Sequence, residues 1–480
     1  MDFPTIPSLM PTNQLDELVK KYIELESRPI KDLENARQDI EVRQGMMRDL
    51  NAMILSLKDK CATLTGDDVV RLLNTRQVTS SRPEIITGSA DGTALNAVYS
   101  IFVERLAKSD TVLSNQLSAS GTTVQTSPGD KTFTITINGV SKDITVSVLT
   151  GETDEAVLSK MAQAINNAAA EDPKLGVSAA VVRETPDTVR LVLTSQKTGS
   201  QQAIRLSETG EANNLLALTG TNSEIQSSGT TGGFLIARDQ LDSKFNINGL
   251  TFIRQSNTVS DAITGVTLNL AAAQAATDAP VQVEVKRDVS TIVSTIQKWL
   301  DSYNKTLKYI QDKTLIDADL GIRGPLAGDY LYVGLKANMR TILQAQVTGL
   351  DPTTGPVSLA QIGITADNSG ALSISDRSRL ESIISQDPNR VSEILGGANG
   401  SITKLQALIS PFVDNLTGII PRQQQALDDR MERIKDRIRS LQERMDQREL
   451  VLRREFSSIL QAMVMLNAQR STLNSIWGIS

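Results

Sequence analysis

The hydrophobic positions near the C-terminus recur in alternating steps of four and three residues. This pattern is typical of the buried seam of a coiled-coil helix, and its members are Leu427, Met431, Ile434, Ile438, Leu441 and Met445. Arg448 interrupts the seam, which resumes after an extra step of four with Leu452, Phe456, Ile459, Met463 and Leu466. Such a stutter locally unwinds a supercoil. Because no Gly or Pro follows Pro421 before about Arg470, we expect one long helix that needs a partner to cover its narrow apolar stripe.

A second heptad-like pattern occupies the N-terminal part of the chain. Its members lie seven residues apart, namely Leu33, Ile40, Met47, Ile54 and Cys61. A shorter amphipathic helix with Leu15, Leu18 and Tyr22 on one face precedes it, capped by Asn13 and broken near Pro29. Two interpretations remain open. The ends form separate coiled coils or ordinary bundle helices, or they pair with each other or with equivalent helices of other subunits.

The middle of the chain, from about Thr79 to Val285, alternates apolar and polar residues as β-strands do. Asn138-Gly139 separates two alternating runs and predicts a hairpin, because Asn-Gly readily adopts positive φ. A helix over 153–170 and two strands around the Pro186-Asp187 turn follow. Residues 219–233 are rich in Gly, Ser and Thr and indicate a loop or linker. A second FxING-like segment at 245–249 predicts another hairpin.

Helical periodicity returns after Pro280, with further helices expected at 326–347, at 376–386 and from Pro388 to Gly396. The predicted fold class is multidomain α+β, with long terminal α-helices forming a coiled-coil or helix-bundle leg and an inserted β-rich α+β head. We expect four parts. They are a helical segment 1–45 that is disordered in the monomer, a shared helical bundle of 46–78 and 286–405, the head of 79–285, and a terminal coiled-coil helix of 406–480.

Composition narrows the possible functions. The 480 residues include no His and one Cys, which excludes Ser-His-Asp catalysis, His-ligated metal sites and an intrachain disulfide. The glycines at 321, 324 and 328 lack the Gly-Lys-Ser/Thr of a phosphate loop. We therefore expect no enzyme, no cofactor and no metal. The net charge of −6 gives no reason to expect a nucleic-acid partner.

Neither a membrane span nor a secretory signal is visible. No apolar run reaches the roughly 18 residues that a spanning helix needs, and the start MDFPTIPSLMPTNQ lacks a basic region followed by an apolar run. The mixed charges of 422–455, with i,i+4 pairs such as Asp429/Arg433 and Glu449/Arg453, indicate a solvated flank of the coiled coil rather than a binding patch.

Several separated blocks together carry a family resemblance. The segment FNINGLTFIRQSNTVSDAITGVTLNLAAA at 245–273, with Phe245, Asn248, Gly249, Asn257, Gly265 and Leu268, resembles the central motif of the flagellar filament cap family, the hook-associated protein 2 family. The blocks 15–40, 288–310, 358–395 and 456–476 are similar to that family in the same order. Within 124–205, residues 133–199 resemble the small repeat of flagellar axial proteins that contains an Ile-Asn pair, here Ile165-Asn166. The family's glycine-rich lead-in is replaced by PTIPSLMPTNQ.

The resemblance implies a structural cap at the distal tip of the flagellar filament that promotes folding and polymerisation of exported flagellin. It implies a secreted protein without a cleavable signal, a ring-like homo-oligomer, commonly a pentamer, and contacts with flagellin, hook-filament junction proteins and an export chaperone through the C-terminal helix. It implies that the terminal seams contact the filament. Two alternatives remain: a surface adhesin acting through the head, or another hook-associated axial or junction protein.

Overall fold

The computed structural model describes residues 12–477 apart from 127, 211–213, 318 and 320. The side chains of 12–16, 18, 126, 322 and 474–477 also lie outside the description. The chain divides into two compact units, one made of 1–72 with 292–480 and the other of 73–291. We call them unit 1 and unit 2. The expected fold class, α+β with long terminal helices and a β-rich insertion, is confirmed.

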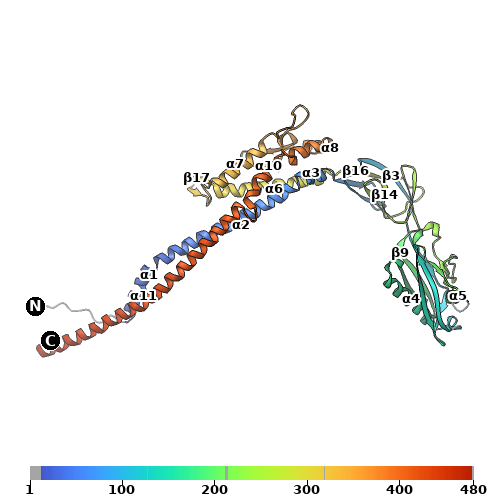
Figure 1. The fold of residues 1–480 in the computed structure, drawn as a ribbon, viewed down its shortest axis with the longest axis horizontal. Coiled ribbons are helices and arrows are strands. Elements are labelled where there is room, and N and C mark those ends of the chain that lie inside the picture. The colour runs from blue at the N-terminus through green and yellow to red at the C-terminus, as the bar shows by residue number, and fades with distance from the viewer. Residues whose placement is uncertain (1–11, 127, 211–213, 318, 320, 478–480) are drawn as a thin grey trace. The chain divides into compact units, whose positions relative to one another are not determined.

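Unit 1 is built mainly of helices (Figure 1). They are α1 (Thr12–Glu26), α2 (Arg28–Ala62), α3 (Gly66–Leu73), α6 (Val289–Thr314), α7 (Tyr330–Gln344), α8 (Arg377–Gln386), α9 (Pro388–Gly396), α10 (Ser401–Val413) and α11 (Ile419–Trp477). Two short hairpins accompany them, β17 (Ile316–Asp317) with β18 (Ile322–Arg323), and β19 (Ile364–Ala366) with β20 (Leu372–Ile374).

The helix boundaries follow the local signals closely. Pro29 lies in the first turn of α2, where its missing N–H leaves no hydrogen bond unmade. Asp329, Asp376 and Asp387 accept hydrogen bonds from the first backbone amides of α7, α8 and α9. Two boundaries differ from expectation. The first helix begins at Thr12 rather than after Asn13, and α7 is shorter than the predicted 326–347.

The core of unit 1 forms around one face of α6. Its large fully buried side chains are Ile292, Ile296, Trp299, Leu300, Tyr303, Leu307 and Ile310. Tyr303 donates a hydrogen bond from Oη to the carbonyl of Gly370, and Tyr309 donates to the carbonyl of Met46. These bonds join α6 to the loop before β20 and to α2, so the bundle combines segments far apart in the sequence.

Unit 2 contains two β modules. Module A holds a five-stranded antiparallel sheet in the order β1 (Arg76–Ser80), β16 (Val281–Arg287), β3 (Ala97–Arg105), β12 (Ser243–Ile247) and β13 (Leu250–Arg254). It also holds a three-stranded sheet of β14 (Thr258–Ile263), β15 (Val266–Leu270) and β2 (Ile86–Ala90). Their inner faces share one apolar core that includes Ile86, Ile101, Phe245, Leu268 and Val283.

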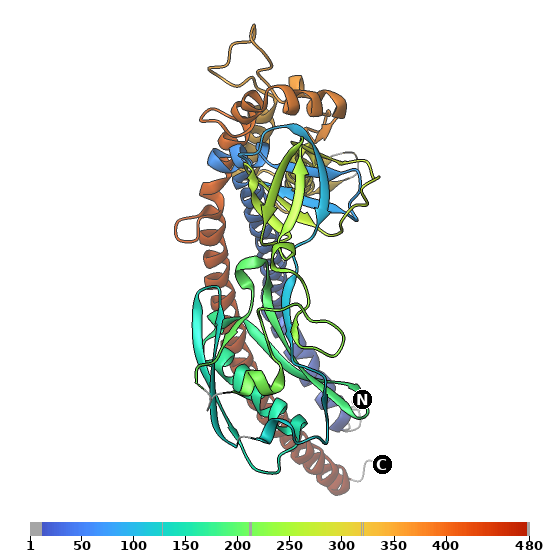
Figure 2. The same cartoon turned by 90° about the vertical axis from the view of Figure 1, so that its right-hand side faces the viewer.

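Module B also has two sheets, with helix α4 (Asp154–Glu171) against its strands (Figure 2). One sheet is β10 (Arg205–Ser207), β6 (Gly129–Ile137) and β7 (Val140–Val148). The other sheet has the order β11 (Gly233–Phe234), β4 (Ser109–Leu113), β9 (Thr188–Thr198) and β5 (Leu117–Ser118), and β8 (Val177–Thr185) also pairs with β9. A short helix, α5 (Leu215–Thr219), follows β10 in the chain.

Both predicted Asn-Gly hairpins are confirmed. Asn138 and Asn248 have φ of 50°, and Gly139 and Gly249 have φ of 77° and 86°, so all four adopt the left-handed conformation of a two-residue turn. They join β6 to β7 and β12 to β13. Several strands of unit 2 were not predicted individually, including β1, β3 and β16; β16 pairs with both β1 and β3 and returns the chain to α6.

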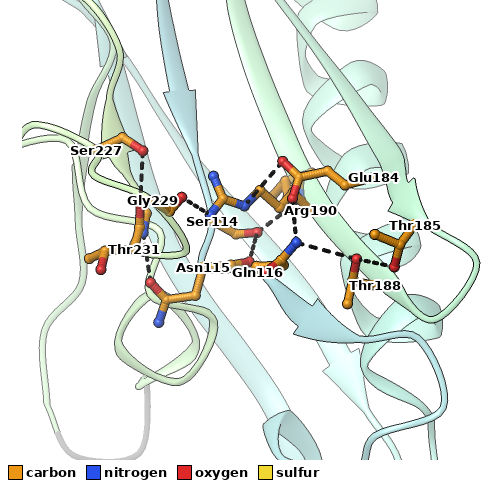
Figure 3. A network of polar contacts seen from close by, with 12 residues as sticks. Ser114, Asn115, Gln116, Glu184, Thr185, Thr188, Arg190, Ser227, Gly229 and Thr231 are labelled. Atoms are coloured by element: carbon orange, nitrogen blue, oxygen red, sulfur yellow. Dashed lines mark hydrogen bonds and ion pairs between the residues drawn. The ribbon is translucent and has the colours of Figure 1, made fainter.

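The Gly/Ser/Thr-rich segment after α5 is a packed loop rather than a linker (Figure 3). Arg190 is buried and donates from Nη2 to the carbonyl of Gly229 at 2.6 Å. Its Nε lies 3.5 Å from Oε1 of Glu184, with which it forms an ion pair. The amide of Gly232 donates to Oδ1 of Asn115 at 2.7 Å, and the amide of Gln116 donates to the carbonyl of Thr230. The loop is therefore held against β9 and the segment between β4 and β5.

Candidate assembly surface

The two terminal heptad patterns pair with each other within the chain. Ile40 of α2 is buried against Met431, Ile434 and Ile438 of α11. Ile30, Leu33, Ala36 and Leu427 are partly buried around this cluster. Gln44 donates from Nε2 to Oδ1 of Asp428 at 2.6 Å beside it. Of the two interpretations left open by the sequence, the structure supports the one in which the ends pair (Figure 1).

The α2 pattern changes partners halfway along the helix. Met47 and Ile54 are buried in unit 1, where α2 also contacts α10, and Sδ of Met47 accepts a hydrogen bond from the hydroxyl of Tyr332 on α7. Cys61 is also fully buried, and burial raises the pKa of its thiol to about 12. It is the small core residue that the sequence suggested. Met47 and Ile54 thus stabilise the helical bundle, and their contribution to assembly stays a prediction.

The stutter of the C-terminal seam coincides with the break between α1 and α2. Arg448 lies with its Nε 3.9 Å from a carboxylate oxygen of Glu26, the last residue of α1. Beyond the break, Val19 and Leu452 are buried, while Tyr22 is 45% exposed. The side chains of Leu15 and Leu18 lie outside the description. The stutter of α11 at Arg448 therefore lies beside the break between α1 and α2.

The last part of the α11 seam is uncovered in the subunit. Leu441, Met445 and Phe456 are half-buried, whereas Ile459, Met463 and Leu466 are 51%, 52% and 62% exposed. Val464, Met465 and Leu473 are also largely exposed, so this end of the helix presents apolar side chains on more than one face. A run of exposed apolar side chains on one helix is the signature of a surface that another protein covers.

The family-motif residues build module A. Phe245 is fully buried and stacks on Phe252 with ring centroids 5.6 Å apart. Asn248 accepts from the amide of Ser100 through Oδ1 at 2.9 Å, which ties the Asn248-Gly249 turn to β3. Leu268 is fully buried. Gly265 has φ of 72°, and a Cβ there would lie 2.5 Å from Oγ1 of Thr93, so only glycine fits.

Two motif asparagines use the same device in different modules. Asn257 accepts from the amide of Ala107 at 2.7 Å and donates to its carbonyl at 2.9 Å. Asn166, next to the fully buried Ile165 on α4, accepts from the amide of Ala179 at 2.9 Å and donates to its carbonyl at 2.8 Å. Each side-chain amide thus bonds to both the N–H and the C=O of one residue, as the backbone of a neighbouring strand would. The sequence showed these residues as family motif, and the structure shows that they join elements.

No candidate metal site is formed by the described residues. They contain no group of three or more carboxylates or thiols able to hold a metal ion. No helix in the described part of the chain is long and apolar enough to cross a bilayer. Buried cysteine and tyrosine side chains have raised pKa values because burial disfavours their charged forms, which fits core positions.

Fold and surface together define a class of protein. Both ends of the chain join in a coiled coil, a β-rich insertion separates them, and an uncovered apolar helix end awaits a partner. This organisation is typical of a structural protein.

The comparisons with known proteins specify the class. Residues 13–110 match the N-terminal model and 241–468 the C-terminal model of flagellar hook-associated protein 2, so the chain belongs to that family. It is 24% identical over 394 residues to the lateral flagellar hook-associated protein 2 of Vibrio parahaemolyticus, covering 82% of this chain and 84% of that protein. It is 26% identical over 348 residues to the B-type protein of Pseudomonas aeruginosa, covering 71% and 70%.

A solved structure has the same fold. The crystal structure of the flagellar cap protein FliD from Escherichia coli, comprising its D1, D2 and D3 domains, aligns with a TM-score of 0.60 at 24% identity. The alignment covers 80% of this chain and 99% of that structure. The resemblance noted from the sequence is thereby confirmed.

Proposed function

We propose that this protein is the structural cap at the distal tip of the bacterial flagellar filament, where it promotes folding and polymerisation of exported flagellin. The family carries this proposal, and one structural observation supports it most directly: the apolar end of α11 is uncovered in the subunit. A helix that must bind the end of a growing polymer needs such a surface, and no catalytic chemistry is required.

The finer parts of the proposal concern partners and location. The protein assembles with itself in a ring, with five copies as the proposed number, and contacts flagellin and the hook-filament junction proteins. An export chaperone covers the C-terminal helix before secretion, which proceeds without a cleavable signal. Residues 1–45 and 406–480 form the filament-contacting part, the bundle of 46–78 and 286–405 supports it, and 79–285 forms the exposed head.

The stutter suggests how the contact remains reversible. A seam interrupted at Arg448 and rich in flexible methionines, such as Met463 and Met465, binds less rigidly than a regular heptad of branched residues. The disorder expected for residues 1–45 in the monomer stays a prediction; in the structure α1 and the first half of α2 lie against α11, and we propose that binding to the filament strengthens this packing. A cap that must move as each flagellin is added needs a contact of this kind.

The proposal is tested by complementing a deletion strain with a variant carrying Ile459→Gln, Met463→Gln and Leu466→Gln. The three side chains are at least half exposed, so the subunit should fold normally and be secreted. We expect short or absent filaments in electron micrographs, and flagellin monomer in the medium. A deletion of 421–480 should give the same defect and leave unit 2 folded.

The matched control replaces exposed apolar residues that lie off the seam, with Val42→Gln on α2 and Leu450→Gln on α11, which are 62% and 57% exposed in the wild type. This variant should form normal filaments. Wild-type filaments and motility with the seam variant or with the truncation would contradict the proposal.

The same strains test the alternative functions. Normal filaments with lost attachment to host surfaces would favour an adhesin acting through unit 2. Filaments that detach at the hook while their tips remain capped would favour a junction protein. Among the described residues, neither alternative has a supporting observation comparable to the uncovered helix end.

A further inference from the structure

The solvent-facing side of α11 carries two charged rows in register with each other. One row is basic and consists of Arg430, Arg437 and Arg444. The other is acidic and consists of Asp429, Asp436 and Glu443. Within each row the residues are seven apart, about 10 Å along the helix axis, and all six side chains are exposed. Each arginine directly follows an acidic residue, so the rows run side by side around the helix.

The arginine row has no partner within the described part of the chain. No ion pair or hydrogen bond joins Arg430, Arg437 or Arg444 to any described residue. The predicted pair Asp429/Arg433 is not formed either, because Asp429 accepts a hydrogen bond from Gln425, whereas the predicted pair Glu449/Arg453 is present at 2.8 Å. In the acidic row, Asp436 lies 3.3 Å from Nη1 of Arg439, so some charges of the helix are paired within it, whereas the arginine row is not.

One member of the acidic row, Asp436, lines a groove between α2 and α11. The groove has a volume of about 450 Å³ and is lined by Glu41, Asp428, Glu432 and Asp436 together with Gln44, Met431, Lys435 and Arg439. Acidic side chains outnumber basic ones in this lining, so the groove favours a cationic side chain. The surface that accepts positive charge thus lies on the same helix as a row of unpaired arginines.

We propose that the arginine row of one copy of this chain binds the acidic row and groove of a neighbouring copy. Equal spacing of the rows lets all three arginines meet acidic partners at once. In a parallel neighbour with no axial shift, each arginine lies within one residue's rise, about 1.5 Å, of its acidic partner. Because the two rows are different surfaces, each copy binds one neighbour with each row, and a contact of this kind closes into a ring when the rotation between copies permits.

This arrangement explains why the rows lie away from the apolar seam. The seam remains available for α2, α1 and the filament, while the charged rows set the neighbour and its register. Charge complementarity of this kind controls specificity and association rate more than affinity, and salt screens it. The contact can therefore form and rearrange without exposing apolar surface.

The inference rests on the proposed self-assembly and is tested with full-length protein by analytical ultracentrifugation at low salt. One variant carries Arg430→Glu, Arg437→Glu and Arg444→Glu, and a second carries Asp429→Arg, Asp436→Arg and Glu443→Arg. Each should weaken self-association by on the order of tenfold or more, because attraction becomes repulsion. An equimolar mixture of the two should associate again, since one variant presents only acidic rows and the other only basic ones.

The matched control has the same change in net charge as the arginine reversal, elsewhere in unit 1. It carries Lys298→Glu, Lys305→Glu and Lys308→Glu on α6, all exposed, and should associate like the wild type. Recovery in the mixture also shows that both reversed variants are folded. If the mixture fails to recover, or if both reversals associate like the wild type, the charged-row contact is wrong while self-assembly stands. If the wild type stays monomeric at every concentration, the proposed assembly fails as well.

Disulfide trapping tests the orientation of the neighbours. Cys61 is buried and does not compete, so a mixture of Asp429→Cys and Arg430→Cys variants reports on parallel contact. We expect a cross-linked dimer from this mixture under mild oxidation. A mixture of Asp429→Cys and Arg444→Cys variants should cross-link far less, and preferential cross-linking of that pair would overturn the parallel arrangement.

Discussion

Asn257→Ala should destabilise unit 2 more than the half-buried position of this side chain suggests. The side chain makes two hydrogen bonds, accepting from the amide of Ala107 at 2.7 Å and donating to the carbonyl of the same residue at 2.9 Å. Ala107 is 4% exposed, so water replaces these bonds poorly. A buried backbone group that loses its partner costs about 1–3 kcal/mol, which gives a loss of about 2–6 kcal/mol for the two groups of Ala107.

The assay is differential scanning calorimetry of the full chain. For a unit the size of residues 73–291, 1 kcal/mol corresponds to a shift of about 2–4 °C in melting temperature, so the unit 2 transition should fall by roughly 4–24 °C. Tryptophan fluorescence should change little in this range, because both tryptophans, Trp299 and Trp477, belong to unit 1.

Asn246→Ala is the matched control. Asn246 also makes two hydrogen bonds, to Glu104 and from Thr251, both 2.8 Å long, but they are side-chain bonds that solvent reaches. Its loss should cost below about 1 kcal/mol. A melting temperature for Asn257→Ala within 2 °C or so of the control would refute the view that this motif asparagine acts as a substitute strand.

Three further predictions concern other parts of the chain. Asn166→Ala should cost a similar amount, about 2–6 kcal/mol, in module B, measured by calorimetry, because its two bonds to Ala179 have the same form; an unchanged transition would contradict this. Burial raises the pKa of Asp110, against the opposing hydrogen bond from the Ile204 amide and the charge of Arg238. The folded protein therefore binds this proton more tightly than the unfolded chain, and the associated stability is present below about pH 4 and lost as pH rises through the folded pKa. Asp110→Asn should flatten that part of the pH–stability profile, and an unaltered profile would show that another group is responsible. In hydrogen exchange, amides of 463–473 should exchange much faster than those of 427–441, since only the latter segment is covered by α2; equal protection would mean that another partner covers the helix end.

Local sequence signals were enough to place the longest helices and the two Asn-Gly hairpins. The heptad spacing predicted α2 and α11, and Asn-Gly predicted the β6–β7 and β12–β13 turns, because these structures depend on side-chain periodicity and on residues that tolerate positive φ. The strand β16 was missed, since its partners β1 and β3 lie far away in the sequence and its seven residues directly precede the helical periodicity of α6.

The candidate surfaces were predictable only in part. The seam residues were visible as a pattern, but a pattern does not say which members a chain covers with its own helices. Three seam methionines look alike in the sequence, yet Met47 is buried in the bundle, Met431 is buried against α2, and Met463 is exposed. Burial depends on which helices end where, and that follows from packing across the whole unit.

The sequence by itself determined the periodicity of the helices, the turns of the hairpins, the absence of histidine chemistry and the family to which the chain belongs. Tertiary structure decided which charges and apolar side chains remain without a partner. Arg437 and Met463 are candidates for contacts with other proteins only because both side chains are exposed in the described part of the subunit. Helix and turn formation depend on neighbours a few residues away, whereas exposure and pairing depend on residues hundreds of positions apart.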